Sequence, residues 1–142
     1  PNADVTYIAH KFSVDAFVQY IGQVPRQQAL CMQRDANALL FLEFKSENAK
    51  GILTGKLFEY LFVKPPIICV GVDEDSSVGF LLRRTGRGKC FGTNSENIAC
   101  ALQRRLSGET NALFPNEKVN YQFISKFSRE IQCEKMLAIT QL

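Results

Sequence analysis

The fold class of this chain is decided by one stretch, ALLFLEFKSENAKGILTGKLFEYLFVKPPIICVGV, Ala38–Val72. It opens and closes with continuous apolar runs, residues 38–42 and residues 67–72. Runs of this length are typical of strands that are buried on both faces, as in parallel sheets. Parallel neighbours need a crossover connection between them, usually a helix. The stretch therefore predicts a strand–helix–strand unit.

The helix of this unit is predicted over residues 55–63. Leu57 and Leu61 lie four residues apart, which gives the helix an apolar side, and Phe58 and Phe62 repeat the same spacing. Thr54 is the expected N-cap. The run Lys64-Pro65-Pro66 ends the helix, because proline cannot continue the hydrogen-bond pattern.

The remaining segments continue this alternation of strands and helices. We expect short strands at residues 17–22 and 89–91, helices at residues 25–34 and 77–84, a helix opened by a capping box at residues 93–96, and a mostly helical tail from about residue 119. This pattern predicts an α/β fold, a Rossmann-like parallel sheet flanked by helices. With about four strands it falls short of a complete doubly wound domain, so we expect an amino-terminal strand–loop–helix to be missing.

Composition bounds the functions that are open to this chain. Its 142 residues, 46% apolar and 22% charged, suit one globular domain, residues 1–142. A net charge of 17 − 14 = +3 and a pI near 8.7 are too mild for a nucleic-acid footprint. A single histidine argues against multi-histidine metal sites, and the apolar runs are too short for a membrane span. The five cysteines lack a C-x-x-C pair, so we expect reduced, mostly buried thiols.

The candidate site is the segment that follows the first buried strand, residues 51–61. In open parallel sheets, ligands bind beyond the carboxyl ends of strands, often at the start of a helix. The backbone N–H groups near Thr54 and Gly55, together with the Lys56 ammonium, suit a diphosphate, and Glu59 suits ribose hydroxyls. The alternative is that Gly51 and Gly55 only shape a loop, while Lys56 and Glu59 form an exposed pair. The spacing does not match a P-loop.

The segment Gly51–Ile68, GILTGKLFEYLFVKPPII, closely resembles the sugar-nucleotide-binding stretch of bacterial glycosyltransferases with two Rossmann-like domains, the GT-B architecture. The glycosyltransferase 4-like group of surface-polysaccharide assembly is the most similar. Weaker matches follow in the same order, so that the resemblance covers about residue 18 to the end of the chain. They are residues 18–26, 33–41 (with Asn37 where Asp is common), 71–88 and 127–129.

The resemblance implies a carboxyl-terminal domain that binds a UDP- or GDP-sugar. Glu59 matches the glutamate that holds the donor ribose, and Thr54, Gly55 and Lys56 match positions around the diphosphate. Arg26 would lie near the base. Many relatives carry a second glutamate, which contacts the donor sugar, at the position of Gly51. That departure leaves the sugar and the stereochemistry open.

The resemblance also implies a partner domain that this chain lacks. In these enzymes an amino-terminal acceptor domain precedes the donor domain, and the sugar is transferred in the cleft between them. The chain begins at Pro1 rather than Met, so we interpret it as a fragment that is inactive alone. No residue is assigned a catalytic role, no metal or other cofactor is expected, and the acceptor is a polysaccharide or a lipid-linked sugar. A cytoplasmic protein in peripheral contact with the inner membrane face fits this role.

Other interpretations stay open. A nucleotide-sugar epimerase of the same architecture and a non-catalytic nucleotide-binding subunit both fit the motif. Asp73-Glu74-Asp75 matches the D-x-D pattern that binds Mn²⁺ or Mg²⁺ in other glycosyltransferases, although acidic residues are also common where a helix begins. The four cations between Arg83 and Lys89 fit a solvated helix end or a contact with anionic lipid.

Overall fold

The computed structural model describes residues 2–43, 53–109, 112–113 and 118–140. The chain divides into two compact units, Pro1–Met32 and Gln33–Leu142, and each unit is described by itself. The first unit contains helix α1 (Asn2–Lys11), the 3₁₀ helix η1 (Asp15–Phe17) and most of helix α2 (Arg26–Asp35). Helix α2 confirms the helix that was predicted at residues 25–34.

The strand that was predicted at residues 17–22 is wrong. Phe17 ends η1, the Val18 N–H donates to the Asp15 carbonyl over 3.2 Å, and residues 18–25 have no regular structure. A strand is stabilised by a neighbour that accepts its hydrogen bonds, and the segment pairs with no strand in the part of the chain that the structure describes. Its apolar side chains stay exposed, Phe17 at 88%.

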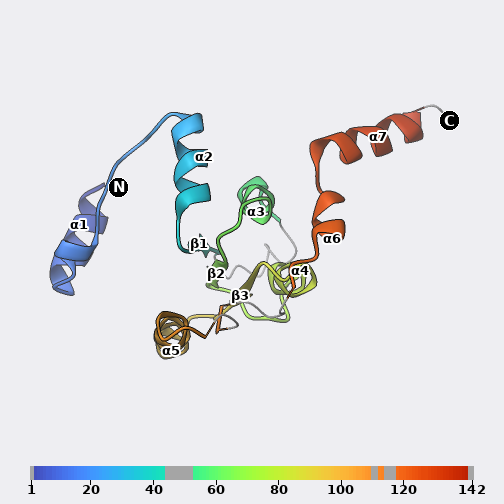
Figure 1. Cartoon of the computed structure of the whole chain (residues 1–142). Coiled ribbons are helices and arrows are strands. Elements are labelled where there is room, and N and C mark those ends of the chain that lie inside the picture. Colours follow the sequence, from blue (N-terminus) through green and yellow to red (C-terminus); the bar gives the residue numbers. More distant parts are fainter. Residues whose placement is uncertain (1, 44–52, 110–111, 114–117, 141–142) are drawn as a thin grey trace. The chain divides into compact units, whose positions relative to one another are not determined.

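The second unit is built on a three-stranded parallel sheet in the order β1-β2-β3 (Figure 1). Strand β1 (Leu39–Leu42) pairs with β2 (Ile67–Val70), which pairs with β3 (Gly88–Cys90). The α/β class and the parallel sheet are thereby confirmed, and the strand that was predicted at residues 89–91 is found as β3, at one edge of the sheet. The described residues contain one strand fewer than predicted.

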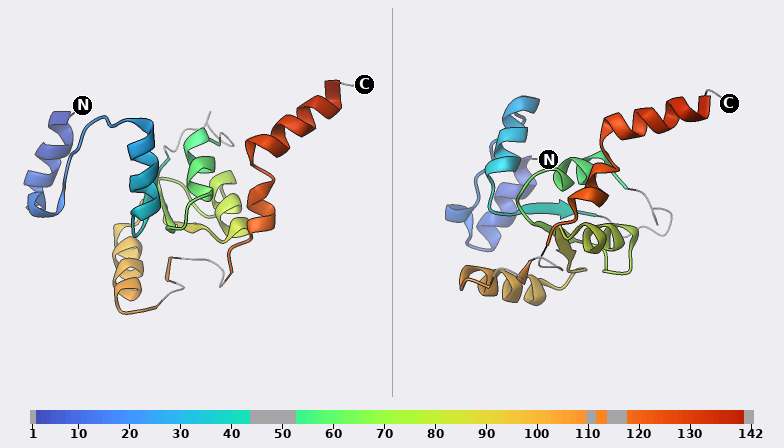
Figure 2. Two further views of the ribbon diagram at one scale, coloured as in Figure 1. Left: turned by 45° about the horizontal axis from the view of Figure 1, so that its top comes forward. Right: turned by 45° about the vertical axis from the view of Figure 1, so that its right-hand side comes forward.

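Helices cover both faces of this sheet. Helices α3 (Gly55–Leu61), α4 (Ser77–Thr85) and α6 (Tyr121–Ser125) pack on the face formed by alternate residues such as Phe41 and Cys69. Helix α5 (Ser95–Leu106) packs on the other face, against Ile68 and Phe91. The right-hand view of Figure 2 shows α3 and α5 on opposite sides of β1.

The helical tail is also confirmed, as α6 and α7 (Arg129–Thr140). Ile124 is buried in the core, and the Phe127 ring lies 5.1 Å from the Phe58 ring of α3, measured between centroids. The Ser128 hydroxyl accepts the Ile131 N–H over 3.3 Å, as expected of a residue that opens a new helical segment.

Two predictions about polar and sulfur-containing side chains need correction. Arg87, one of the four cations that were expected at a solvated helix end or against anionic lipid, is only 2% exposed. Its Nη2 donates to the Pro65 carbonyl over 3.0 Å, and burial lowers its pKa. Of the five cysteines, Cys69 and Cys90 are buried, whereas Cys100 and Cys133 are exposed. The prediction that most of the thiols are buried is therefore wrong. No described helix has the length and apolar character needed to cross a membrane.

Helix α5 begins one residue later than the capping box predicted. Its N-cap is Asn94, whose side-chain oxygen accepts the Asn97 N–H over 3.0 Å, rather than Thr93. Replacing an N-cap asparagine with alanine typically costs about 1 kcal/mol. We therefore expect Asn94→Ala to lower the free energy of unfolding by about that amount in urea denaturation. Thr93→Ala serves as the control, and an equal loss from both variants would contradict the assignment.

Candidate functional site

The candidate site lies where α3 begins, at the carboxyl end of β1. Thr54 occupies the N-cap with extended backbone (φ −82°, ψ 151°), and its carbonyl accepts the Leu57 N–H over 3.1 Å. Its side chain makes no capping hydrogen bond. The first N–H groups of any α-helix have no intrahelical partner, which here leaves those of Gly55 and Lys56 at the helix start.

Helix α3 separates polar from core residues along its short length. Leu57, Tyr60 and Leu61 are buried, whereas Lys56 is exposed and Glu59, one turn later, is half-buried. The Lys56 ammonium lies 5.8 Å from the centroid of the Tyr60 ring. The buried leucine and tyrosine side chains therefore fix one side of the helix to the core. The predicted polar residues lie on its more exposed side.

Gly55 has no crowded neighbour. A Cβ atom placed on it would meet nothing within 4 Å, and its backbone does not need glycine. Packing within the protein therefore does not require glycine at this position. An open backbone at the first helical residue is what close approach by a ligand would need.

A cavity of about 430 Å³ brings two of the predicted residues together. Thr54 and Lys56 line it from the start of α3. The rest of its described lining comes from the last part of β1 and the residue after it: Leu40, Phe41, Leu42 and Glu43. The cavity therefore has both apolar and polar lining residues, and it lies at the carboxyl end of β1, the usual ligand position in this fold class.

Glycines shape this edge of the sheet. The Glu43 N–H donates to the Val70 carbonyl over 2.9 Å, and the Gly71 N–H donates to the Gly92 carbonyl over 2.7 Å. Gly71 has a φ of +104°, and a Cβ atom there would overlap the Glu43 carbonyl oxygen. Only glycine lets β2 continue so close to the end of β1.

Glu43 is a residue of this cavity that sequence reasoning missed. Its Oε2 atom is buried and has no hydrogen-bond partner. The available signal was its position as the first polar residue after a buried strand, where functional side chains of open parallel sheets are found.

Two predicted site residues cannot be placed relative to this cavity. Arg26 is the first residue of α2 and belongs to the other compact unit. Gly51 lies outside the described residues. Of the other four predicted residues, Thr54 and Lys56 line the cavity, whereas Gly55 and Glu59 belong to α3 but are not among the described lining residues.

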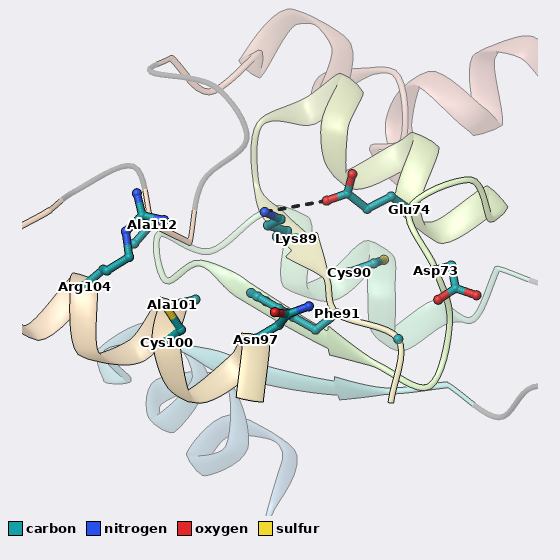
Figure 3. Close-up of a pocket in the computed structure, with 11 residues that line it drawn as sticks. Asp73, Glu74, Lys89, Cys90, Phe91, Asn97, Cys100, Ala101, Arg104 and Ala112 are labelled. Atoms are coloured by element: carbon teal, nitrogen blue, oxygen red, sulfur yellow. Dashed lines mark ion pairs between the residues drawn. The ribbon is translucent and has the colours of Figure 1, made fainter. Parts of the chain in front are cut away.

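A second cavity, of about 410 Å³, lies beside β3 and α5 (Figure 3). Asp73 and Glu74 contribute to its lining, and Glu74 Oε1 lies 3.9 Å from the Lys89 ammonium. The N-cap of α4 is Ser76, whose Oγ accepts the Gly79 N–H over 3.1 Å. Among the described residues, no group of three or more acidic, histidine or cysteine side chains is arranged to hold a metal ion.

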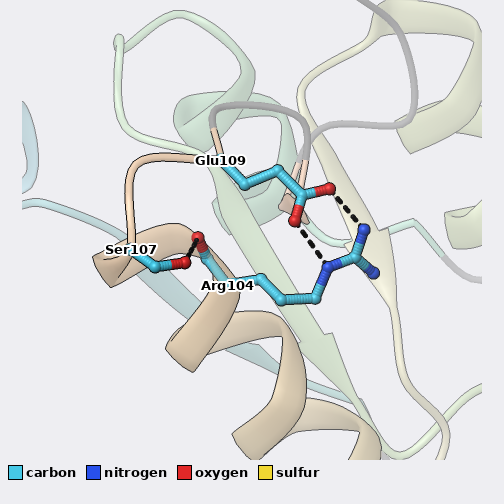
Figure 4. A network of polar contacts seen from close by, with 3 residues as sticks. All are labelled: Arg104, Ser107 and Glu109. Carbon is cyan, nitrogen blue, oxygen red and sulfur yellow. Dashed lines mark hydrogen bonds and ion pairs between the residues drawn. The ribbon is translucent and has the colours of Figure 1, made fainter.

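Arg104 of α5 also lines the second cavity, and its guanidinium pairs with Glu109, which follows the end of the same helix (Figure 4). Its Nε lies 2.7 Å from Glu109 Oε2, and its Nη2 pairs with Oε1 of the same carboxylate. The hydrogen bond from Arg104 lowers the pKa of Glu109. This bidentate pair offsets the one arginine charge in the described lining of the cavity, whose other charged side chains are Asp73, Glu74 and Lys89.

Comparison with known proteins finds no relative of this chain. No protein-family model, no curated protein and no solved structure matches the chain. The functional interpretation therefore depends on the residues of the α3 site and on the motif that contains them.

Proposed function

We propose that this chain is the donor-binding domain of a bacterial glycosyltransferase of the GT-B architecture, in the glycosyltransferase 4-like group. One observation carries the proposal. Within the segment that resembles the sugar-nucleotide stretch, Thr54 and Lys56 line a cavity at the carboxyl edge of a parallel sheet. The same segment continues through α3 into β2, in the order that the resembled enzymes have.

The chemistry of the site suits a nucleoside diphosphate. The N–H groups at the start of α3 and the Thr54 hydroxyl are hydrogen-bond donors for phosphate oxygens, and Lys56 adds a positive charge. Glu59 lies one turn further along the helix, where its carboxylate accepts hydrogen bonds from ribose hydroxyls. Arg26 near the base and Gly51 near the sugar complete the set that the resemblance assigns.

The reaction would transfer the donor sugar to a polysaccharide or lipid-linked acceptor. As the bond to the diphosphate breaks, charge grows on the leaving phosphate, and helix N–H groups with Lys56 stabilise that charge without a metal ion. The acceptor would be held by a separate amino-terminal domain, which would also supply the catalytic base. This role places the protein in the cytoplasm, at the inner face of the membrane.

Titration of the 142-residue chain with UDP and GDP tests the proposal. We expect one of the two nucleotides to bind and Glu59→Ala to weaken that binding by about tenfold or more, because hydrogen bonds to a charged group are lost. Glu96→Ala, which removes an exposed glutamate from the first turn of α5, is the matched control and should leave affinity unchanged.

Equal affinity of the wild type and Glu59→Ala would remove the ribose assignment. Binding that requires Mn²⁺ or Mg²⁺ and is lost with EDTA would favour the Asp73–Asp75 interpretation instead. Isothermal titration calorimetry provides both measurements.

A further inference from the structure

The four cations between Arg83 and Lys89 do not form one surface. Arg87 is buried. The Lys89 ammonium pairs with the Glu74 carboxylate, and the Arg83 guanidinium donates a hydrogen bond to the Glu74 carbonyl oxygen. Arg84, in the last turn of α4, is exposed and contacts a different element. The cationic surface therefore has to be built from Arg84 and its neighbours in space.

Helix α6 lies beside the end of α4 and supplies a second cation (Figure 2). The Asn120 N–H, at the N-cap of α6, donates to the Thr85 carbonyl over 2.9 Å. The Arg84 Cζ atom and the Lys126 ammonium nitrogen each lie 5.5 Å from the centroid of the Phe123 ring. Both cations are exposed, so two positive charges meet at one aromatic side chain on the surface.

The surroundings of Phe123 are rich in positive charge. Helix α4 contains two arginines, residues 118–129 contain three lysines and arginines, and neither segment contains aspartate or glutamate. The first acidic residue that follows is Glu130. The Phe123 ring packs edge-on against Phe127, with 5.5 Å between the centroids. We call the surface formed by Arg84, Phe123, Lys126 and Phe127 the α4–α6 face.

The composition of the α4–α6 face is complementary to a membrane that contains anionic phospholipids. Arginine and lysine near a bilayer are attracted to anionic head groups, and their methylene stems rest on apolar surface while the charged ends reach outward. Phe123 supplies that apolar surface between the two cations. The same ring is poorly suited to stacking with a nucleic-acid base, because both cations and Phe127 already lie against it.

We infer that the α4–α6 face binds the surface of membranes that contain anionic phospholipids, through Arg84 and Lys126. Neither side chain belongs to the α3 site, so this contact does not depend on the donor-binding function. If that function holds, the contact would keep the donor domain at the membrane, where a lipid-linked acceptor lies.

Co-sedimentation of the 142-residue chain with sucrose-loaded vesicles tests the inference. Vesicles of phosphatidylcholine alone are compared with vesicles that contain about one-third phosphatidylglycerol. We expect binding to the anionic vesicles only, and loss of binding in about 1 M NaCl, where the Debye length falls to about 3 Å. Arg84→Gln/Lys126→Gln should weaken binding by about tenfold or more, because each cation near an anionic surface contributes separately.

Lys89→Gln/Arg104→Gln is the matched control, since it removes the same charge from the β3–α5 side of the second compact unit. These two cations already pair with Glu74 and Glu109, so their loss should change vesicle binding by no more than about twofold. Far-UV circular dichroism and melting temperature verify that both double variants fold.

Several outcomes would overturn the inference. They are equal binding to both kinds of vesicle, no binding to either kind, and equal losses from the two double variants. A single-stranded oligonucleotide that binds more tightly than the anionic vesicles, and is released by Arg84→Gln/Lys126→Gln, would assign the face to nucleic acid instead.

Nucleotide titration separates this inference from the proposed function. Arg84→Gln/Lys126→Gln should bind UDP or GDP as the wild type does, because the substitutions lie outside the α3 site. Vesicle binding by a wild type that binds neither nucleotide would overturn the donor-binding function and support the α4–α6 face. Nucleotide binding without vesicle binding would have the opposite meaning.

Discussion

Gly71→Ala should destabilise the second compact unit by about 3 kcal/mol or more. Alanine is strained at a φ of +104°, and its Cβ would overlap the Glu43 carbonyl oxygen, which belongs to a backbone that is already held by β2. Relief of this overlap requires the ends of β1 and β2 to separate. Urea denaturation followed by far-UV circular dichroism measures the loss in free energy of unfolding.

Gly55→Ala is the matched control for this substitution. The Cβ atom that it adds has open space within 4 Å, and alanine is favoured over glycine inside a helix by roughly 0.5–1 kcal/mol. We expect this variant to be as stable as the wild type or slightly more stable. Comparable losses from the two variants would show that the approach of Gly71 to Glu43 does not constrain the sheet edge.

Leu57→Ala should lower the free energy of unfolding by about 2–5 kcal/mol. The side chain is completely buried between α3 and the sheet, in the core cluster that also contains Phe41 and Leu61. The substitution removes apolar surface from this core and leaves a cavity that neighbouring side chains fill only in part. The same denaturation measurement gives the value.

Leu106→Ala provides the comparison for the core substitution. Leu106 ends α5 and is 87% exposed, so its truncation should change stability by no more than about 0.5 kcal/mol. A Leu57→Ala variant as stable as Leu106→Ala would contradict the packing of α3 against the sheet.

Some elements could be predicted because their signal is local. The apolar runs at residues 38–42 and 67–72 are too continuous for an amphipathic surface element, and they became β1 and β2. The segment at residues 17–22 has a similar composition, but a strand also needs a neighbour to pair with, and that requirement is not visible locally. The Asn94 cap was missed by one residue, because neighbouring polar side chains offer equivalent capping groups.

The candidate site could likewise be predicted only in part. Thr54 and Lys56 follow from a helix start after a buried strand, and both line the cavity. Glu43 is the first polar residue after the same buried strand, but the burial of its carboxylate oxygen depends on tertiary packing at the end of β1 and is not visible in the sequence. Arg87 shows the opposite error, since a run of cations reads as solvated although one of them is buried against the Pro65 carbonyl.

Helix α3 has only seven residues, and its core side chains alternate with those assigned to the ligand. A helix this short is not stable in isolation, so it persists only while its buried residues are packed. In the proposed function, folding and ligand binding are therefore thermodynamically linked through about two turns of backbone. In the proposed function, a ligand held by Lys56 and Glu59 would raise the melting temperature, and a core substitution that populates the unfolded chain would weaken apparent affinity without touching the ligand.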